Sequence, residues 1–343
     1  MRILVTGAAG FLAGYLVPEL LEAGHEVVGV EHFGTYGPTS KSYDTHPRYK
    51  LVTGDATDSD LLRNLTADCD QVVASAGLTG RGSSFSELAY DLLATNERIV
   101  ASTFDAAIDA FLDGHLERIV VLSSSMVYES AGVFPTPEGA ERTSPPPVST
   151  FGFQKLATEY FARGAWEQYR LPYTILRLSN VVGIGERHAL RDRDALSGNV
   201  RQALTNAVPE LVLRILTGED PVHILGEGNQ VRQFTYAGDA ARGIRLAMES
   251  DVARNQDFNI ARSEGTTILE LAARIWAKVN GDRPFHYVSD APYRYDVPFR
   301  VPDVRKARAL LGFEATTSLD DMLDEVIPWI RAEVAAGRVA GTR

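Results

Sequence analysis

Cysteine is scarce in this sequence, and long apolar runs and an excess of positive charge are missing from it. Its 343 residues include one cysteine, Cys69, so no internal disulfide can form, and no C-x-x-C pattern indicates a zinc site. No apolar run reaches the roughly 20 residues that a membrane-spanning helix needs. The first residues pass directly into a strand pattern with no cleavable signal segment before it. We therefore expect a cytoplasmic protein with no membrane partner.

Acidic residues outnumber basic ones in this chain. It has 45 Asp and Glu against 34 Lys and Arg, a net charge of −11. Such a surface repels the phosphates of nucleic acids, so no nucleic-acid partner is expected. The seven histidines are scattered without metal-ligand spacing, and we expect no metal site. An anionic small substrate would need a local basic pocket.

Short apolar runs alternate with stretches of helical spacing along the first half of the chain. Strands that alternate with helices form a parallel sheet covered on both faces, so the pattern predicts an α/β fold of the Rossmann type, doubly wound. After about residue 180 the pattern loosens, which predicts a smaller C-terminal α/β substrate lobe. We expect residues 1–178 plus about 236–262 in the first domain, and 179–235 and 263–335 in the lobe. The expected strands are 2–6, 26–31, 49–53, 71–76, 118–123 and 173–178, and the expected helices 11–23, 86–111, 152–169, 239–249 and 301–313.

A glycine-rich turn, GAAGFLAG at residues 7–14, separates the first expected strand from the first helix. Glycines let the backbone approach a pyrophosphate closely, and a helix N-terminus offers N–H groups and a partial positive charge. A plain turn is the alternative, but an acidic residue at the end of the second strand favours a dinucleotide site. That residue is Glu31. Its carboxylate can accept hydrogen bonds from ribose hydroxyls and repels a 2′-phosphate, which favours NAD over NADP.

Several further sequence motifs follow one another along the chain in the same order as in a known protein family. Together they resemble the extended branch of the short-chain dehydrogenase/reductase family, which contains NAD-dependent nucleotide-sugar epimerases, dehydratases and decarboxylases, UDP-galactose 4-epimerase among them. The resemblance runs from residue 1 to about residue 330. The motifs are TGAAGF (6–11), GDATD (54–58), VVASAGLTG (72–80), Asn96, LSSSMVY (122–128), FGFQK (151–155), LRLSNVVG (176–183), GEGNQVRQFTY (226–236) and FNIA (258–261).

The resemblance implies a set of contacts with NAD. For each residue a core or loop position is the alternative, and the common order of the motifs favours the cofactor role. The epimerases often have a lysine where this chain has Thr79, so that contact is open. The implied cofactor residues are Gly7, Ala9, Gly10, Phe11, Leu12 and Glu31, then Asp55 and Ala56 at the adenine, then Ser75, Ala76, Gly77 and Thr79, and finally Asn96 and Lys155.

The family's chemistry needs a tyrosine that takes a proton from a sugar hydroxyl while NAD takes the hydride. A lysine four residues later lowers the tyrosine pKa, and this spacing puts both on one helix face. Here Lys155 is in place, and Ser124 matches the family's serine or threonine, with Ser123 and Ser125 as alternatives. The tyrosine position is Phe151. Phenylalanine has no oxygen, and loss of a general base typically costs about 10²–10⁴ in rate.

Three explanations of Phe151 are open. An engineered Tyr→Phe change would keep the ring and delete only the oxygen. A natural enzyme could use another base, or the chain could be a natural binder without catalysis. The intact Lys155 and serine cluster favour the engineered change, because a protein selected for catalysis retains them. No other tyrosine in the chain precedes a lysine by four residues.

The resemblance also implies residues for a nucleotide-diphosphate sugar. Asn180 and Arg232 match residues that contact the diphosphate, and a guanidinium fork suits that bidentate task. Tyr128 could contact substrate or pack internally, and Arg300 could instead be a solvated surface residue. The other implied substrate contacts are Ser124, Ser125 and Met126 in the serine loop, Asn199 and Val200 facing the sugar nucleotide, and Arg300 with Asp303 as a second arginine and a ribose-binding acid.

The residues of the serine loop also help to distinguish between the reactions of the family. Its 4,6-dehydratases carry a carboxylate after the serine or threonine, whereas this chain has Ser125 and Met126, which disfavours dehydration. We expect epimerisation at C4 of the sugar, through a transient 4-keto sugar. The alternatives are a decarboxylase or ketoreductase of the same family and a non-catalytic sugar-nucleotide binder. The resemblance further implies a homodimer through helices 86–111 and 152–169.

Overall fold

The computed structural model describes residues 1–343 except 35–36, 38, 79–88, 186–206, 293–296 and 338–343. Its centre is a seven-stranded, entirely parallel sheet in the order β11-β6-β5-β4-β1-β2-β3. From β1 the strand order runs outward through β2 and β3 to one edge, and from β4 it runs outward to the other edge. Doubly wound dinucleotide folds have the same reversal of strand order between β1 and β4. The strands are β1 (Arg2–Thr6), β2 (Glu26–Glu31), β3 (Tyr49–Thr53), β4 (Gln71–Ala74), β5 (Arg118–Ser124), β6 (Tyr173–Leu178) and β11 (Gln256–Ile260).

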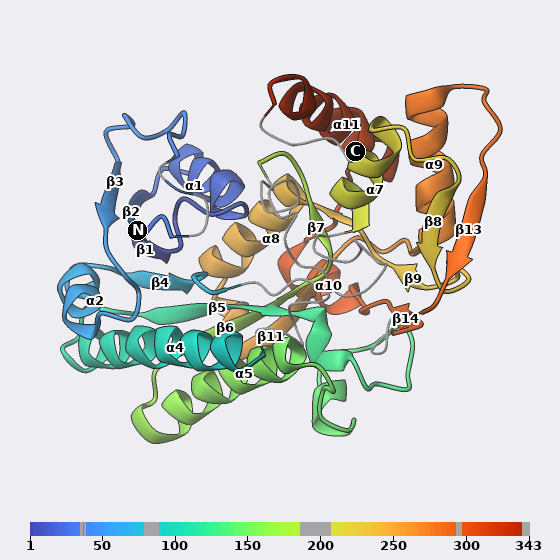
Figure 1. Ribbon diagram of the computed structural model, residues 1–343. Helices are drawn as coiled ribbons and strands as arrows, with labels where there is room; N and C mark the ends of the chain where they lie inside the picture. The colour runs from blue at the N-terminus through green and yellow to red at the C-terminus, as the bar shows by residue number, and fades with distance from the viewer. Residues whose placement is uncertain (35–36, 38, 79–88, 186–206, 293–296, 338–343) are drawn as a thin grey trace.

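Helices cover both faces of this sheet (Figure 1). One face packs against α1 (Ala13–Glu22) and α8 (Ala237–Glu249) through a large apolar cluster. The other face packs against α2 (Ser59–Thr66), α4 (Ala89–Leu112) and α5 (Thr150–Tyr169) through a second cluster. Because both faces are buried, the strands are apolar along their whole length rather than alternating. The Rossmann-type fold predicted from the sequence is therefore confirmed.

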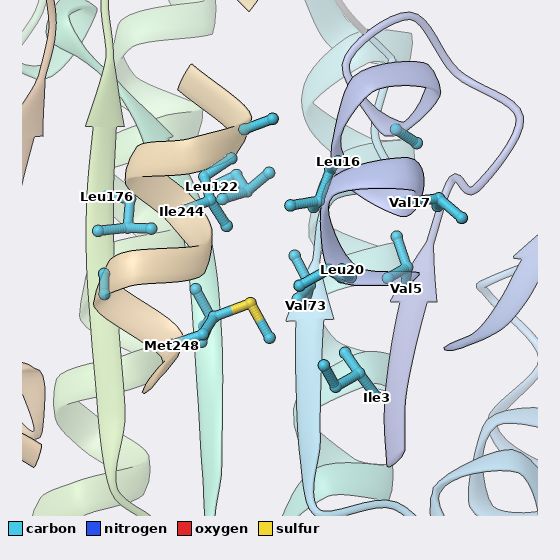
Figure 2. Packing of buried hydrophobic residues seen from close by; sticks show 14 of the residues in the cluster. Ile3, Val5, Leu16, Val17, Leu20, Val73, Leu122, Leu176, Ile244 and Met248 are labelled. Carbon is cyan, nitrogen blue, oxygen red and sulfur yellow. The ribbon is translucent and has the colours of Figure 1, made fainter. Parts of the chain in front are cut away.

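Figure 2 shows how the first cluster closes the space between helix and sheet. Leu16 and Leu20 of α1 and Ile244 and Met248 of α8 point toward the strands, where Val73 lies between them. All five side chains are fully buried. Burying each large aliphatic side chain stabilises the fold by about 1.5–3 kcal/mol, so this layer holds α1 rigidly against β1.

The remaining elements form a smaller region with its own apolar cluster, drawn at the upper right of Figure 1. Val182 and residues within 208–234, 271–276 and 319–330 supply that cluster. Its helices are α7 (Ala207–Leu216), α9 (Ile268–Asn280) and α11 (Leu319–Ala335), and its strands β7 (Val181–Val182), β8 (Val222–Leu225), β9 (Val231–Arg232), β10 (Thr235–Tyr236), β12 (Thr266–Thr267), β13 (Tyr287–Asp290) and β14 (Phe299–Arg300).

The last expected helix differs from the pattern expected from the sequence in its length and in its packing. The helix expected over 301–313 is shorter, since α10 spans Arg305–Leu311. Ala307 and Phe313, which fall in the expected substrate lobe, pack in the first cluster beside α8. Apolar spacing cannot tell which of two cores a short helix joins. The remaining short helices are η1 (Ser125–Tyr128), η2 (Ala140–Arg142) and η3 (Asp251–Ala253).

Among the described residues, no helix is long and apolar enough to cross a membrane.

Candidate active site

The glycine-rich turn lies between β1 and α1, at the carboxyl edge of the sheet. Gly7 adopts a φ of +73°, and a Cβ there would lie 3.0 Å from the Cα of Ala76, so the position requires glycine. At Gly10 a Cβ would lie 3.0 Å from the Gly7 carbonyl oxygen. The first turn of α1 carries no acidic residue, and Leu12 at its N-cap makes no side-chain cap. The positive end of α1 thus faces the turn, as a pyrophosphate requires.

Glu31 ends β2 beside this turn. Its carboxylate accepts hydrogen bonds from the backbone N–H groups of Ala9 at 3.3 Å, His32 at 3.0 Å and Phe33 at 2.9 Å. These bonds fix the carboxylate next to the glycine turn. The arrangement fits the ribose contact expected from the sequence, and a carboxylate at this place repels a 2′-phosphate.

The ends of β3 and β4 complete this edge. Thr6 Oγ1 accepts hydrogen bonds from the backbone N–H groups of Ser75 and Ala76 at 3.0 and 2.9 Å. Asn96, buried in α4, binds both the N–H and the C=O of Leu78 at 2.7 and 2.9 Å. Asn96 therefore fixes the chain that leaves β4. Asp55, Ala56 and Gly77 lie on the loops after β3 and β4, and Thr79 lies outside the described residues.

The three candidate catalytic positions come from the end of β5 and the start of α5. Ser124 Oγ caps η1 by accepting the N–H of Met126 at 3.2 Å. Lys155 Nζ donates to the carbonyl of Leu122 at 3.0 Å and lies 5.9 Å from the centre of the Phe151 ring. Desolvation lowers the pKa of the Lys155 ammonium to about 8. A small cavity beside Lys155 is also lined by Thr6, Ala76, Gly77, Asn96, Leu122 and Gln154.

The three consecutive serines, Ser123 to Ser125, differ in their burial and in their hydrogen bonds. Ser123 is buried and donates to Glu159 at 2.7 Å. Ser125 is also buried and donates to the hydroxyl of Ser179 at 3.3 Å. Ser124 is the member of the row that is not buried. Of the three serines, Ser124 therefore presents its hydroxyl most readily to a substrate, although the sequence left the choice open.

Two arginines meet on the substrate side. Strand β14 pairs in parallel with β9, and Arg300 is the direct register partner of Arg232. Arg232 is buried and donates to the Val231 carbonyl at 2.9 Å. Arg300 Nη1 lies 2.6 Å from the sulfur of Met126 in η1. The Cα positions of the two arginines are therefore adjacent, and the side chain of Arg300 reaches the serine loop.

The other expected substrate residues have varied surroundings. Asn180 adopts a φ of +37° and its side-chain amide donates to the Gln233 carbonyl at 3.0 Å. The Asp303 carboxylate accepts hydrogen bonds from the backbone N–H and the guanidinium group of Arg305, the shortest of 2.6 Å, and these bonds keep the pKa of Asp303 below its ordinary value. Asn199 and Val200 lie outside the described residues.

A buried charge network under the serine loop was not anticipated from the sequence. Arg177 of β6 is fully buried and binds the carboxylates of Glu159, Glu141 and Asp257. Although burial lowers it, the Glu159 carboxylate holds the pKa of Arg177 well above its usual value. Tyr128, left open above, is buried and receives a hydrogen bond of 2.5 Å from Arg177. A charged residue inside the apolar run YTILRL was the signal available in the sequence.

This combination of a parallel doubly wound sheet, a glycine turn at a helix N-terminus and an acidic residue ending β2 defines a dinucleotide-binding protein. Residues 3–261 match the model of the NAD dependent epimerase/dehydratase family. The chain belongs to that family, and its cofactor is NAD.

Similar proteins span almost the whole chain. The protein named uncharacterized UDP-glucose epimerase YtcB of Bacillus subtilis is 26% identical over 96% of this chain and 98% of its own length. UDP-glucuronic acid decarboxylase 1 of Danio rerio is 26% identical over 97% of this chain and 73% of its own length. The names of these relatives refer to different reactions, so the relatives show the family and not the reaction.

Solved structures agree on the fold. UDP-glucuronic acid 4-epimerase from Bacillus cereus, in complex with UDP-glucuronic acid and NAD, matches with a TM-score of 0.80 and 26% identity, over 97% of this chain and 99% of its own. A tyrosine-to-phenylalanine mutant of that epimerase, with a 4-deoxy-4-fluoro analogue and NAD, matches with a TM-score of 0.80 and 27% identity over the same shares.

Proposed function

We propose that this protein is built for NAD-dependent epimerisation at C4 of a nucleotide-diphosphate sugar, through a transient 4-keto sugar, and that Phe151 silences the reaction. The observation that carries the proposal is the composition of η1, where Met126 stands next to Arg300 with no carboxylate. Elimination of water needs an acid there, whereas epimerisation needs only hydroxyl and amine groups around the sugar carbon.

Each residue has a role in this proposal. Ser124 binds the reacting sugar hydroxyl, and Lys155 supplies positive charge on the same face of α5 as residue 151. Arg232 and Arg300 hold the diphosphate, and Asn180, Ser125 and Met126 shape the sugar site. The glycine turn, Glu31 and the loops after β3 and β4 hold NAD, which when bound supplies the hydride acceptor.

Phe151 is the departure that the proposal must explain. With phenylalanine, no oxygen stands beside Lys155 to take the proton from the sugar hydroxyl. The solved tyrosine-to-phenylalanine mutant of the Bacillus cereus epimerase holds a UDP-sugar analogue and NAD, which supports the idea that such a change preserves binding. A binder without catalysis is therefore the second candidate function, favoured by Phe151 itself, and a decarboxylase or ketoreductase is the third.

The test is turnover of a panel of UDP-, dTDP-, GDP- and CDP-sugars by the chain as it stands and by Phe151→Tyr. We expect only Phe151→Tyr to interconvert one sugar with its C4 epimer, with a rate at least about 10² higher. Phe153→Tyr, an exposed position two residues along the same helix, is the matched control and stays inactive.

The other outcomes are equally informative. Equal turnover by both forms means that another group is the base, and the proposed mechanism is wrong. Binding of one sugar nucleotide without turnover by either form makes the protein a binder. A product that has lost carbon dioxide points to the decarboxylase.

We also propose a homodimer through α4 and α5. These two helices pack together and expose several aromatic side chains, among them Tyr90, Phe153 and Tyr160, with exposures of 77, 47 and 62%. Exposed apolar patches of this kind mark interfaces. The cytoplasmic location expected from the sequence stays a prediction.

A further inference from the structure

Helix α5 carries a third residue on the face that holds Phe151 and Lys155. Glu159 follows Lys155 by four residues, so the three side chains stand one turn apart along the helix. The Glu159 side chain is fully buried. Its position places a carboxylate one turn beyond Lys155 and two turns beyond Phe151, between α5 and the sheet.

Two neighbouring strands hold this carboxylate. Arg177 of β6 donates from Nε to Oε1 at 2.8 Å and from Nη2 to Oε2 at 2.7 Å. Ser123 of β5 donates to the same Oε1 at 2.7 Å. A bidentate arginine–carboxylate pair tolerates little change in distance or angle, so α5 is fixed both along its axis and about it.

The two strand residues stand next to the site. Ser123 immediately precedes Ser124, and Arg177 donates to the hydroxyl of Tyr128 at the end of η1. The network therefore joins the element that carries Ser124 to the helix that carries Phe151 and Lys155. Stability alone does not account for it, because a buried ion pair is about as stabilising as apolar packing of the same volume.

We propose that Glu159 is a positioning residue: clamped by Arg177 and Ser123, it fixes the register of α5 against β5 and thereby sets the separation between Ser124 and the pair at 151 and 155. The inference rests on the proposed function for its catalytic consequence. A misplacement of about 1 Å between reacting groups can cost as much as 10²-fold in rate.

The chain offers a matched control in Glu141. Glu141 is equally buried and binds the same Arg177 at 3.0 Å, and also Arg163. It lies in η2, outside α5 and β5. Its removal deletes the same kind of buried charge and leaves in place the direct contacts of Glu159 with Arg177 and Ser123.

The first arm compares Glu159→Gln with Glu141→Gln in the chain that carries Phe151→Tyr. We expect Glu159→Gln to lower kcat by about 10- to 100-fold with KM within about threefold. Glu141→Gln is expected to change kcat by less than about threefold, although both lower the Tm. An unchanged kcat in Glu159→Gln, or equal losses in the two variants, overturns the inference.

A second variant guards against a Glu159→Gln chain that does not fold. Ser123→Ala removes one buried hydroxyl and keeps the ion pair. Its kcat is expected to fall several-fold with an unchanged KM. If kcat is unaffected, the link between β5 and Glu159 does not position the site.

The second arm needs no turnover and uses the chain as it stands. Crystal structures of Glu159→Gln and Glu141→Gln are compared through the distance from Lys155 Nζ to the Leu122 carbonyl, 3.0 Å here. We expect it to lengthen in Glu159→Gln alone, and an unmoved α5 overturns the inference. If Phe151→Tyr shows no turnover, the proposed function fails, and this arm decides the inference separately.

Discussion

Arg300 and Arg232 lie directly opposite each other in the parallel pair β14 and β9. Like charges opposite each other on neighbouring strands destabilise a sheet. The arrangement is reasonable for a protein that binds a dianion between them, because the ligand then neutralises both charges. The protein as a whole has a net charge of −11, so two adjacent arginines differ from its general acidic character.

The first prediction concerns this arginine pair. Arg232→Gln and Arg300→Gln are each expected to weaken the binding of UDP by about tenfold or more, since a hydrogen bond to a charged group contributes about 1.5–3 kcal/mol. Titration calorimetry measures the change. Arg308→Gln, an exposed arginine on α10, is the control. If UDP binds both variants as tightly as the parent, the pair is not the diphosphate site.

The second prediction concerns the choice of cofactor. Glu31→Ala removes the carboxylate that repels a 2′-phosphate, so the preference for NAD over NADP is expected to fall at least about tenfold. Quenching of protein fluorescence by NADH and NADPH measures it. Glu26→Ala, at the other end of the same strand, should leave the preference intact. An unchanged ratio in Glu31→Ala would mean that other groups select the cofactor.

The third prediction follows from the lowered pKa of Lys155, about 8 in the folded protein against 10.5 for an ordinary lysine. Between these values the unfolded chain binds more protons than the folded one, so the free energy of unfolding rises with pH. Relative to Lys155→Met, the parent should gain roughly 2–5 °C in Tm from pH 8 to pH 10.5.

Thermal unfolding in a pH series checks this difference. Lys50→Met, at an exposed position of β3, is expected to follow the parent throughout the series. If the Tm of Lys155→Met runs parallel to that of the parent over the same pH range, Lys155 is not desolvated as described.

The fourth prediction concerns the proposed dimer. Tyr160→Glu places a charge at the centre of the exposed face of α5, and we expect the dimer to dissociate because an unpaired charge is costly to bury in an interface. Light scattering after size exclusion gives the mass. Tyr287→Glu, on an exposed strand far along the chain, should keep the mass of the parent. A parent chain that is already monomeric contradicts the proposal directly.

Local pattern was sufficient for much of the fold. The predicted strand over 173–178 coincides with β6, and the helix expected over 152–169 agrees with α5 at its C-terminal end and begins two residues later than the helix in the structure. Continuous apolar runs and helical spacing are properties of neighbouring residues, so they can be read along the chain. The helix expected over 301–313 was too long, because its first residues lie in an extended segment paired with Thr136.

The sequence by itself determined the doubly wound sheet, the glycine turn with Glu31, and the substitution of Phe151 beside an intact Lys155. Each depends on residues close in the chain or on a motif with fixed spacing. Only the tertiary structure decided that Ser123 is buried on Glu159 while Ser124 is not buried, that Tyr128 is buried on Arg177, and that Arg232 and Arg300 are register partners. These relations join residues up to 68 positions apart, on elements that packing brings together, and no local pattern specifies which residues then become neighbours.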